Sequence, residues 1–412
     1  MTQLKGNLIF GQSGGPTSVI NASAMGVFLE ALDHPDIIPH VYGMRHGIEG
    51  FLKGEFYDIG KEDRSELELL RATPSSILGT CRYKLADPDV DDTEYRQLLD
   101  LLRRHDIRYF FYNGGNDSMD TCDKIGYFLK KHDYACRVIG IPKTVDNDLM
   151  GTDHCPGFGS AARYVATSIA EVWQDAHSYD LPMVVVFEAM GRHAGWLAGA
   201  SALANVVGQG PDLIYLPERP FDVEQFVEDT RRLVDRQKIV MVCVSEGVST
   251  ADGKLLAEAL SDRATDAFGH KQLGGVAALL ADVIQERLDV KVRGIEFSLL
   301  QRAGAHLASK TDVDEAILAG RAGVRAALEG HSGVMMGFKR VNEDPYRAEI
   351  IHVPLNDVAN HERTVPDAWI NEAGNHVTEE FVDYALPLIQ GDAYAVTEHG
   401  LPRHARLKKV RV

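Results

Sequence analysis

Residues 7–32 read NLIFGQSGGPTSVINASAMGVFLEAL, a short apolar run that ends near a glycine pair and leads into a helical pattern. The run 7–12 is apolar in its interior, as expected for a strand covered on both faces. Gly14 and Gly15 allow a tight turn before the helix expected at 17–32. The stretch therefore predicts a strand, a turn and a helix, the repeating unit of parallel sheets.

The same alternation continues along the chain. Further strands are expected at 108–115, 137–142, 183–189, 212–217, 238–247 and 294–300. Helical patterns lie at 93–105, 118–132, 158–178, 222–236, 272–288 and 312–328. This order is typical of an α/β fold with mainly parallel, doubly wound sheets, in which ligands lie at the carboxyl ends of the strands.

The length of 412 residues favours two domains over one ordinary core. We expect two similar, Rossmann-like domains with an active-site cleft between them. The first would span 1–150, completed by a segment around 300–345. The second would span 151–295, completed by the C-terminal segment 346–412. The chain would cross between the domains more than once, because the glycine turn at 14–15 and the arginines at 293 and 302 lie far apart in the sequence.

Composition limits the class of protein. The chain is 45% hydrophobic and 25% charged, as in folded globular proteins, and its formal net charge of −17 disfavours a nucleic-acid binder. No apolar run reaches the roughly 18 residues that span a bilayer, and the first apolar stretch is too short for a signal peptide. The five cysteines form no CxxC pattern, so we expect free thiols and a cytoplasmic location.

Glycine-rich and polar loops follow the predicted strands. The turn at Gly14 and Gly15 would let a phosphate approach the backbone, although a plain tight turn is the alternative. In the loop GGNDS at 114–118, Asn116 and Asp117 offer oxygen ligands for Mg²⁺, with a helix cap as the alternative.

The loop PKTVDND at 142–148 is the most informative. Side chains two residues apart in extended backbone point the same way, so Asp146 and Asp148 can share a face. Two such carboxylates repel each other unless a cation or proton intervenes. A solvated acidic turn is the alternative to a catalytic site that also contains Lys143.

Three later segments complete the pattern. MGRHAG at 190–195 puts Arg192 at a strand end, where its guanidinium could bind a phosphate. Glu246 ends another strand and could bind sugar hydroxyls or cap a helix. The cations that lie beside these turns, against the negative net charge, are Arg82, Lys143, Arg192, Arg293 and Arg302.

Taken in order, the motifs GGPTSVIN, ILGTCRY, GGNDS, PKTVDND, MGRHAG, SEG and LLQR resemble those of the phosphofructokinases. The stretch 364–389 also looks like the pyrophosphate-dependent branch. The resemblance implies reversible transfer of a phosphoryl group from pyrophosphate to the 1-hydroxyl of fructose 6-phosphate, in glycolysis or gluconeogenesis. It further implies Mg²⁺ as cofactor, small-molecule substrates only, and a homodimer or homotetramer.

The resemblance also implies residue roles, with the donor on the first domain and the sugar phosphate mainly on the second. Catalytic roles fall to Asp146 as general base, Lys143, Asp117 and Arg192. The residues implied for the sugar phosphate are Thr144, Val145, Asp146, Met190, Gly191, Arg192, Glu246, Arg293, Gln301 and Arg302. Those implied for pyrophosphate are Gly14, Gly15, Arg82 and Lys143, and those for the metal are Asn116 and Asp148.

Donor choice depends on two positions. ATP-using relatives carry glycine where this sequence has Asp117 and Lys143. An aspartate adds bulk and negative charge where a nucleotide phosphate would lie, and a lysine supplies charge that a shorter donor needs in the transition state. Both differences favour pyrophosphate.

Alternatives remain open from the sequence. One is an ATP-dependent phosphofructokinase. Another is a pyrophosphate-dependent kinase for a different sugar phosphate, such as sedoheptulose 7-phosphate, because Leu299 stands where relatives often have His or Tyr. A silent regulatory subunit is disfavoured by the intact Asp146, and a nicotinamide dehydrogenase by the lack of a GxGxxG turn with an acidic partner.

Overall fold

The computed structural model describes residues 4–261 and 275–412. The chain divides into two compact units. Unit 1 comprises Met1–Ser160, Arg302–Glu362 and Gln390–Val412, and unit 2 comprises Ala161–Gln301 and Arg363–Ile389.

The strands are β1 (Asn7–Gln12), β2 (Val41–Met44), β3 (Phe56–Asp58), β4 (Ile107–Gly114), β5 (Arg137–Pro142), β6 (Met183–Ala189), β7 (Leu213–Tyr215), β8 (Ile239–Ser245), β9 (Lys291–Glu296), β10 (Val334–Glu343), β11 (Tyr346–Pro354), β12 (Thr397–Glu398) and β13 (Leu401–Pro402). The helices are α1 (Ile20–Leu32), α2 (Gly47–Leu52), α3 (Arg64–Glu68), α4 (Thr93–Arg104), α5 (Asn116–Lys131), α6 (Phe158–Ala176), α7 (Trp196–Ala200), α8 (Val223–Gln237), α9 (Leu256–Ser261), α10 (Val276–Arg287), α11 (Leu300–Ala303), α12 (Lys310–Glu329), α13 (Leu355–Val358) and α14 (Glu379–Ala385).

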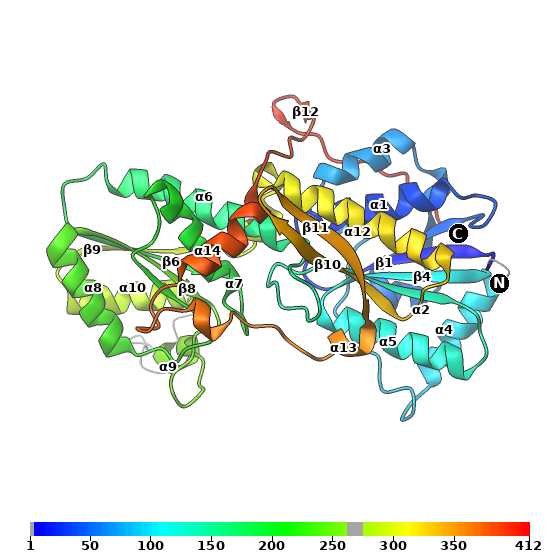
Figure 1. Ribbon diagram of the computed structural model, residues 1–412, viewed down its shortest axis with the longest axis horizontal. Coiled ribbons are helices and arrows are strands. Elements are labelled where there is room, and N and C mark those ends of the chain that lie inside the picture. The colour runs from blue at the N-terminus through cyan, green and yellow to red at the C-terminus, as the bar shows by residue number, and fades with distance from the viewer. Residues whose placement is uncertain (1–3, 262–274) are drawn as a thin grey trace, which may run out of the picture. The chain divides into compact units, whose positions relative to one another are not determined.

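Unit 1 is built on a sheet of strand order β11-β10-β5-β4-β1-β2-β3. The strands from β10 to β2 run parallel, and the edge strands β11 and β3 are antiparallel to their neighbours. Helices α1 and α12 cover one face and α4 and α5 the other (Figure 1). Side chains along the central strands alternate between the two faces, so Phe110 packs into one core and Phe111 into the other.

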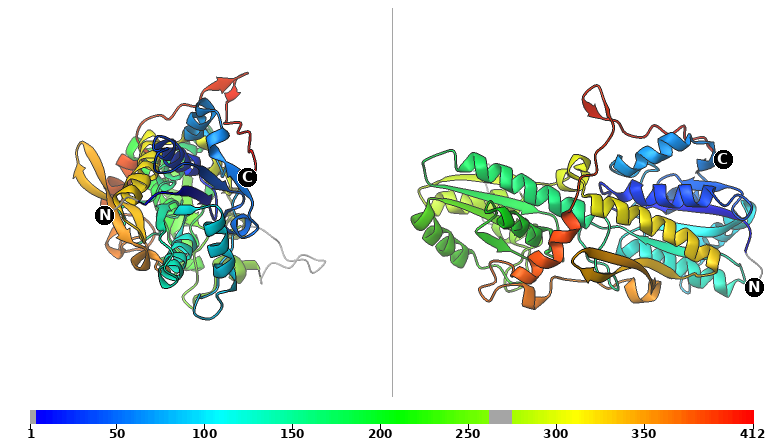
Figure 2. Two further views of the ribbon diagram at one scale, coloured as in Figure 1. Left: turned by 90° about the vertical axis from the view of Figure 1, so that its right-hand side faces the viewer. Right: turned by 45° about the horizontal axis from the view of Figure 1, so that its top comes forward.

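Helices α1 and α12 lie side by side along the sheet (Figure 2). Their contact needs glycine, because a Cβ built on Gly320 would lie 2.2 Å from the carbonyl oxygen of Ser23. In the reverse direction, a Cβ on Gly26 would lie 2.3 Å from the carbonyl oxygen of Ile317. The two backbones therefore touch, which fixes α12 against the sheet that carries the candidate site.

Unit 2 contains a sheet of order β7-β8-β6-β9, in which every pair is parallel. Val184 and Val186 of β6 pack with Phe226 of α8 and Leu280 of α10 in one core. Helix α7 contacts β7 and β8. The chain thus has two doubly wound α/β units, which confirms the expected fold class; the cleft expected between them stays a prediction.

Several expected boundaries were wrong. The strand expected at 294–300 is β9 at Lys291–Glu296, and residues 297–300 lead into α11. The segment 346–412 does not complete the second domain as a whole. Strand β11 pairs with β10 of unit 1, and the end of the chain lies against β3, where the amide of Asp58 donates to Val410 O at 2.9 Å. Within 346–412, only Arg363–Ile389 joins unit 2.

Two expectations from composition concerned free thiols and membrane-spanning segments. All five cysteines are free thiols, and four of them are buried. No helix in the described part of the chain is both long and apolar enough to cross a membrane.

Candidate active site

The loop after β5 folds back on itself. The amide of Thr144 donates to Pro156 O at 3.2 Å, and its hydroxyl oxygen accepts from the amide of Asp146 at 3.1 Å. Asn147 is buried with φ +55°, and its side-chain oxygen accepts from the amide of Cys155 at 2.9 Å. These bonds fix the backbone on both sides of Asp146, which is itself partly buried.

Lys143 joins the first and third motifs. Its side chain is 3% exposed, and Nζ donates to Gly15 O at 2.7 Å. Burial lowers the pKa of Lys143 to about 8, although the nearby carboxylates of Asp146 and Asp148 oppose that shift. A lysine in this setting loses its proton at a lower pH than an exposed lysine does.

Two arginines from other segments of the chain lie near Lys143. A Cβ built on Gly15 would lie 2.7 Å from Arg302 Nη1, so this glycine leaves the space that the guanidinium uses. The loop that carries Arg82 is attached to the glycine turn, since the amide of Gly14 donates to Cys81 O at 3.0 Å. Both arginines are close enough to lower the pKa of Lys143. Three cations from distant segments thus converge in unit 1.

Asp148 fits a divalent cation. Burial raises the pKa of its carboxyl, with a smaller contribution from the charge of Glu362, and a hydrogen bond from Thr144 opposes the shift. Its Oδ1 is buried and has no hydrogen-bond partner among the described residues. An orphaned carboxylate oxygen is the ligand type that Mg²⁺ prefers. The described residues contain no group of three or more His, Cys, Asp or Glu placed to hold a metal, so a cation here would keep water or substrate oxygens as further ligands.

The loop at 114–118 differs from expectation. Asn116 is engaged by the backbone after α13, because its side-chain oxygen accepts from the amide of Asn360 at 2.6 Å and its NH₂ donates to His361 O. Asn116 therefore anchors that segment, and its expected role as a metal ligand stays a prediction. Asp117 is 78% exposed at the start of α5, with Lys84 3.6 Å away.

In unit 2, the strand ends bring together four of the expected sugar-phosphate residues. The amide of Met190 donates to Gln301 Oε1 at 3.1 Å, and the amide of Gly191 donates to Glu246 Oε1 at 3.4 Å. Gly191 has φ +127°, and a Cβ there would lie 2.3 Å from Ala194 O. Arg192 follows with an exposed side chain. The turn thus requires glycine and presents Arg192 and Glu246 outward.

Two expected members lie elsewhere. Arg293 sits within β9 opposite Val185, four residues before the end of β6 at Ala189, about 13 Å along the strand. It lines a surface pocket with Glu171 and Asp175. Arg302 belongs to unit 1 beside Gly15. The strand register therefore separates Arg293 from the Met190–Glu246 cluster within unit 2.

The similarity of the chain to known proteins agrees with this geometry. A family model described as "Phosphofructokinase" matches residues 7–327. The chain belongs to the phosphofructokinase family.

Relatives within the family match nearly the whole chain. A pyrophosphate--fructose 6-phosphate 1-phosphotransferase of Xanthomonas campestris pv. campestris is 46% identical, covering 99% of this chain and 97% of the relative. An enzyme of the same name from Halomonas elongata is 45% identical, covering 98% and 97%. The solved structure of a pyrophosphate-dependent phosphofructokinase from Nitrosospira multiformis matches with a TM-score of 0.89 at 40% identity, covering 99% and 98%. Phosphofructokinases generally use a divalent metal ion, in keeping with the buried oxygen of Asp148.

Sequence reasoning missed residues that shape the phosphofructokinase site without carrying a motif. Glu218 accepts hydrogen bonds at 2.9 Å from the amides of Gly195 and Val365, and so ties the MGRHAG loop to the later segment. Glu362 adds to the raised pKa of Asp148, and Leu149 forms a β-bridge with Glu362. The sequence offered one indication of a role for Glu218, which is that this carboxylate lies between two prolines in PERP at 217–220.

Proposed function

We propose that this phosphofructokinase transfers a phosphoryl group from pyrophosphate to the 1-hydroxyl of D-fructose 6-phosphate, giving fructose 1,6-bisphosphate and phosphate. The observation that carries the proposal is the convergence of Lys143, Arg82 and Arg302 beside Asp146 and Asp148. Carboxylates for a base and a metal, set among cations that can face a highly charged donor, suit phosphoryl transfer. The names of the full-length relatives support the same donor and acceptor.

The proposed chemistry is a direct in-line displacement. Asp146 accepts the proton of the 1-hydroxyl as that oxygen attacks the nearer phosphorus of pyrophosphate. The new P–O bond forms as the bond to the bridging oxygen breaks, and phosphate leaves with the electron pair. Lys143, Arg82 and Arg302 stabilise the negative charge that spreads over the transferring group. A divalent cation, Mg²⁺ in this proposal, would be held by Asp148 and would neutralise charge on the donor oxygens.

Donor choice follows from two side chains in this proposal. Lys143 fills the space beside Gly15 and supplies a positive charge there. Asp117 presents a negative charge and added bulk at the N-terminus of α5. A nucleotide would have to place its further phosphate against that carboxylate, which is unfavourable. Pyrophosphate has no such group, so an ATP-dependent reaction is disfavoured.

The residues proposed to bind the sugar phosphate are Thr144, Val145, Asp146, Met190, Gly191, Arg192, Glu246 and Gln301. Arg192 would pair with the 6-phosphate, and Glu246 would accept hydrogen bonds from sugar hydroxyls. The proposal includes a cytoplasmic homodimer or homotetramer acting in glycolysis or gluconeogenesis. Arg293 is exposed on the edge strand β9, so in such an oligomer it would be able to contact another copy of the chain.

Phosphorus NMR tests the reaction directly. Purified protein is mixed with Mg²⁺, pyrophosphate and fructose 6-phosphate, and the phosphorus signals are followed with time. The proposal predicts loss of pyrophosphate with equal gains of orthophosphate and of the 1-phosphate signal of fructose 1,6-bisphosphate. Orthophosphate released without sugar would indicate a pyrophosphatase and contradict the proposal. Replacing the sugar by sedoheptulose 7-phosphate tests the alternative acceptor in the same way.

A further inference from the structure

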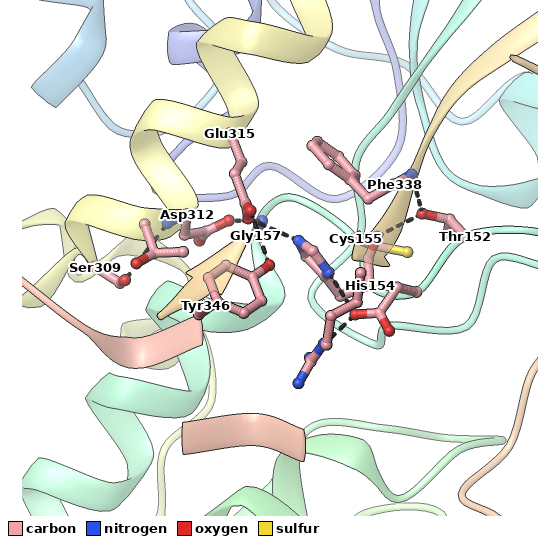
Figure 3. A network of polar contacts seen from close by, with 12 residues as sticks. Thr152, His154, Cys155, Gly157, Ser309, Asp312, Glu315, Phe338 and Tyr346 are labelled. Atoms are coloured by element: carbon pink, nitrogen blue, oxygen red, sulfur yellow. Dashed lines mark hydrogen bonds and ion pairs between the residues drawn. The ribbon is translucent and has the colours of Figure 1, made fainter. Parts of the chain in front are cut away.

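His154 lies at the centre of a buried polar network behind the β5 loop (Figure 3). Its ring is enclosed by two carboxylates: Nδ1 lies 2.9 Å from Asp153 Oδ1, and Nε2 lies 2.7 Å from Glu315 Oε2. The residue is 3% exposed and its ring stacks on Phe338, with centroids 4.9 Å apart. An imidazole with a carboxylate at each nitrogen donates from both when it is protonated.

The network continues into the β10–β11 hairpin. Tyr346 donates from its hydroxyl to Glu315 Oε1 at 2.8 Å. Arg340 Nη2 donates to Asp153 Oδ1 at 3.1 Å, and its guanidinium lies over the Tyr346 ring at 5.1 Å. Each carboxylate that faces His154 is therefore held by a second group from the hairpin, which leaves the ring little freedom.

Helix α12 holds the same segment from its first turn. The buried carboxylate of Asp312 accepts from the amides of Gly157 at 2.9 Å and Ser160 at 2.8 Å. Asp312 and Glu315 are three residues apart and so lie on one face of the helix. The segment 152–160 is thus fastened to α12 at two points, one through backbone amides and one through His154.

The charge of His154 matters to this attachment. Burial by itself lowers the pKa of the ring, but ion pairing with Glu315 and Asp153 overcomes that effect and raises the pKa to about 9. The groups facing the ring from the neighbouring elements are Asp153, Glu315, Arg340 and Tyr346. This pKa favours an imidazolium at neutral pH. Loss of its charge would leave Glu315 and Asp153, both partly buried, without the cation between them, although Asp153 would keep its pairing with Arg340.

The fastened segment supports the candidate catalytic loop directly. Pro156 accepts from the amide of Thr144, and the amide of Cys155 donates to Asn147, one residue on either side of the 145–146 turn. We infer that the imidazolium of His154, held between Asp153 and Glu315, is a positioning residue. It would hold the backbone of the loop that carries Asp146 and Asp148 in place. The inference rests on the proposed function for its catalytic consequence, and on the hydrogen bonds alone for its structural one.

Three variants test the inference in the full-length protein. His154→Gln keeps a hydrogen-bonding side chain and removes the charge of the ring, Glu315→Gln removes the negative charge of one partner of the ring, and Tyr346→Phe removes a single hydroxyl. Glu349→Gln serves as the control, because Glu349 is exposed on the same hairpin and pairs only with exposed Arg347 among the described residues. Turnover with pyrophosphate and fructose 6-phosphate is measured together with hydrogen exchange of residues 143–157.

We expect His154→Gln to lower kcat by about 10- to 100-fold with less than about threefold change in either KM, since the loop is displaced while the binding groups remain. Hydrogen exchange of 143–157 should rise by at least about tenfold, and Tyr346→Phe should show a smaller effect in the same direction. If His154→Gln does not fold, Glu315→Gln and Tyr346→Phe decide the question.

The inference is overturned if the folded variants keep kcat and the exchange of 143–157 within about twofold of Glu349→Gln. A lower melting temperature with both readouts unchanged would also overturn it, because that result shows a purely stabilising role. If the unaltered protein has no turnover, the proposed function fails instead. The exchange of 143–157 then still tests whether His154 holds the loop.

Discussion

At the scale of single residues, Asp146 and Lys143 lie three positions apart but have different surroundings. Asp146 is partly exposed on a backbone held by Thr144 and Asn147, whereas Lys143 is buried against Gly15. A base must reach the substrate proton, and a buried cation must face developing charge. The two residues can therefore be separated experimentally.

Asp146→Asn should lower turnover by at least about 10³-fold, because the amide is nearly isosteric but cannot accept the proton. Affinity for fructose 6-phosphate, measured by calorimetry, should stay within about threefold. Asp123→Asn, in α5 beside the surface pocket that Tyr127 also lines, is the matched control. Normal turnover with weakened sugar binding would show that Asp146 is a binding residue and not the base.

Lys143 should produce an alkaline limb in the pH dependence of kcat/KM for pyrophosphate. Its pKa is lowered to about 8 by burial, so the charged form is present below that pH and is lost as pH rises through it. Lys143→Arg keeps its charge throughout this range and should move the limb upward, even if its turnover is lower. An unchanged limb in Lys143→Arg would assign it to another group.

How far the site could be predicted depends on the range of the contacts. The PKTVDND motif alone indicated Lys143, Asp146 and Asp148, because their chemistry is local. The engagement of Asn116 by residues 360 and 361 was not predictable, since those partners lie more than 240 positions away. The position of Arg302 beside Gly15 was missed for the same reason: its motif gave the residue type but not the unit to which it belongs.

At the scale of elements, the close contact of α1 and α12 fixes the helix from which Asp312 and Glu315 project. Gly320→Ala should destabilise the protein by about 2 kcal/mol or more, because the new Cβ would meet backbone atoms that cannot move independently. Gly126→Ala in α5 is the control: its Cβ would meet nothing nearer than 3.9 Å, and helix propensity favours it by up to about 1 kcal/mol. Equal denaturation midpoints for the two variants would contradict the packing argument.

The attachment of α12 through His154 should make stability depend on pH. The folded-state pKa of about 9 lies above the ordinary value of 6.5, so this contribution is fully present below pH 6.5 and is lost as pH rises through about 9. The shift corresponds to about 3 kcal/mol. Urea denaturation at pH 7 and pH 10 should show this loss in the unaltered protein and a smaller one in His154→Gln. Equal losses would contradict the assignment.

The elements themselves were predicted unevenly. Strands β1, β5 and β6 match the expected ranges because they are central, mostly apolar and bounded by glycine or polar residues. The β10–β11 hairpin was missed, since only the first half of β10 is buried and the second half is polar. Short β2 and β3 were missed as well. A strand with one polar half lacks the uniform signal by which buried parallel strands are recognised.

At the scale of the whole molecule, the chain length and the strand–helix alternation together predicted two α/β units, but not the path of the chain between them. The C-terminal residues return to unit 1, where Arg403 pairs with Glu66 and the amide of Ala405 donates to Thr73 at 2.9 Å. The position of this C-terminal segment depends on hydrogen bonds between residues more than 300 positions apart in the sequence. Composition and periodicity contain no information about them.

The central claim is that the chain uses pyrophosphate and not ATP, and a coupled assay of the purified protein tests it most directly. Fructose 1,6-bisphosphate formation is followed with fructose 6-phosphate, Mg²⁺ and either donor at equal concentrations. The account predicts turnover with pyrophosphate and a kcat/KM for ATP lower by at least about 10²-fold, because Asp117 opposes the nucleotide and Lys143 serves the shorter donor. Turnover with ATP alone would keep the fold and the base but contradict the roles assigned to Asp117 and Lys143.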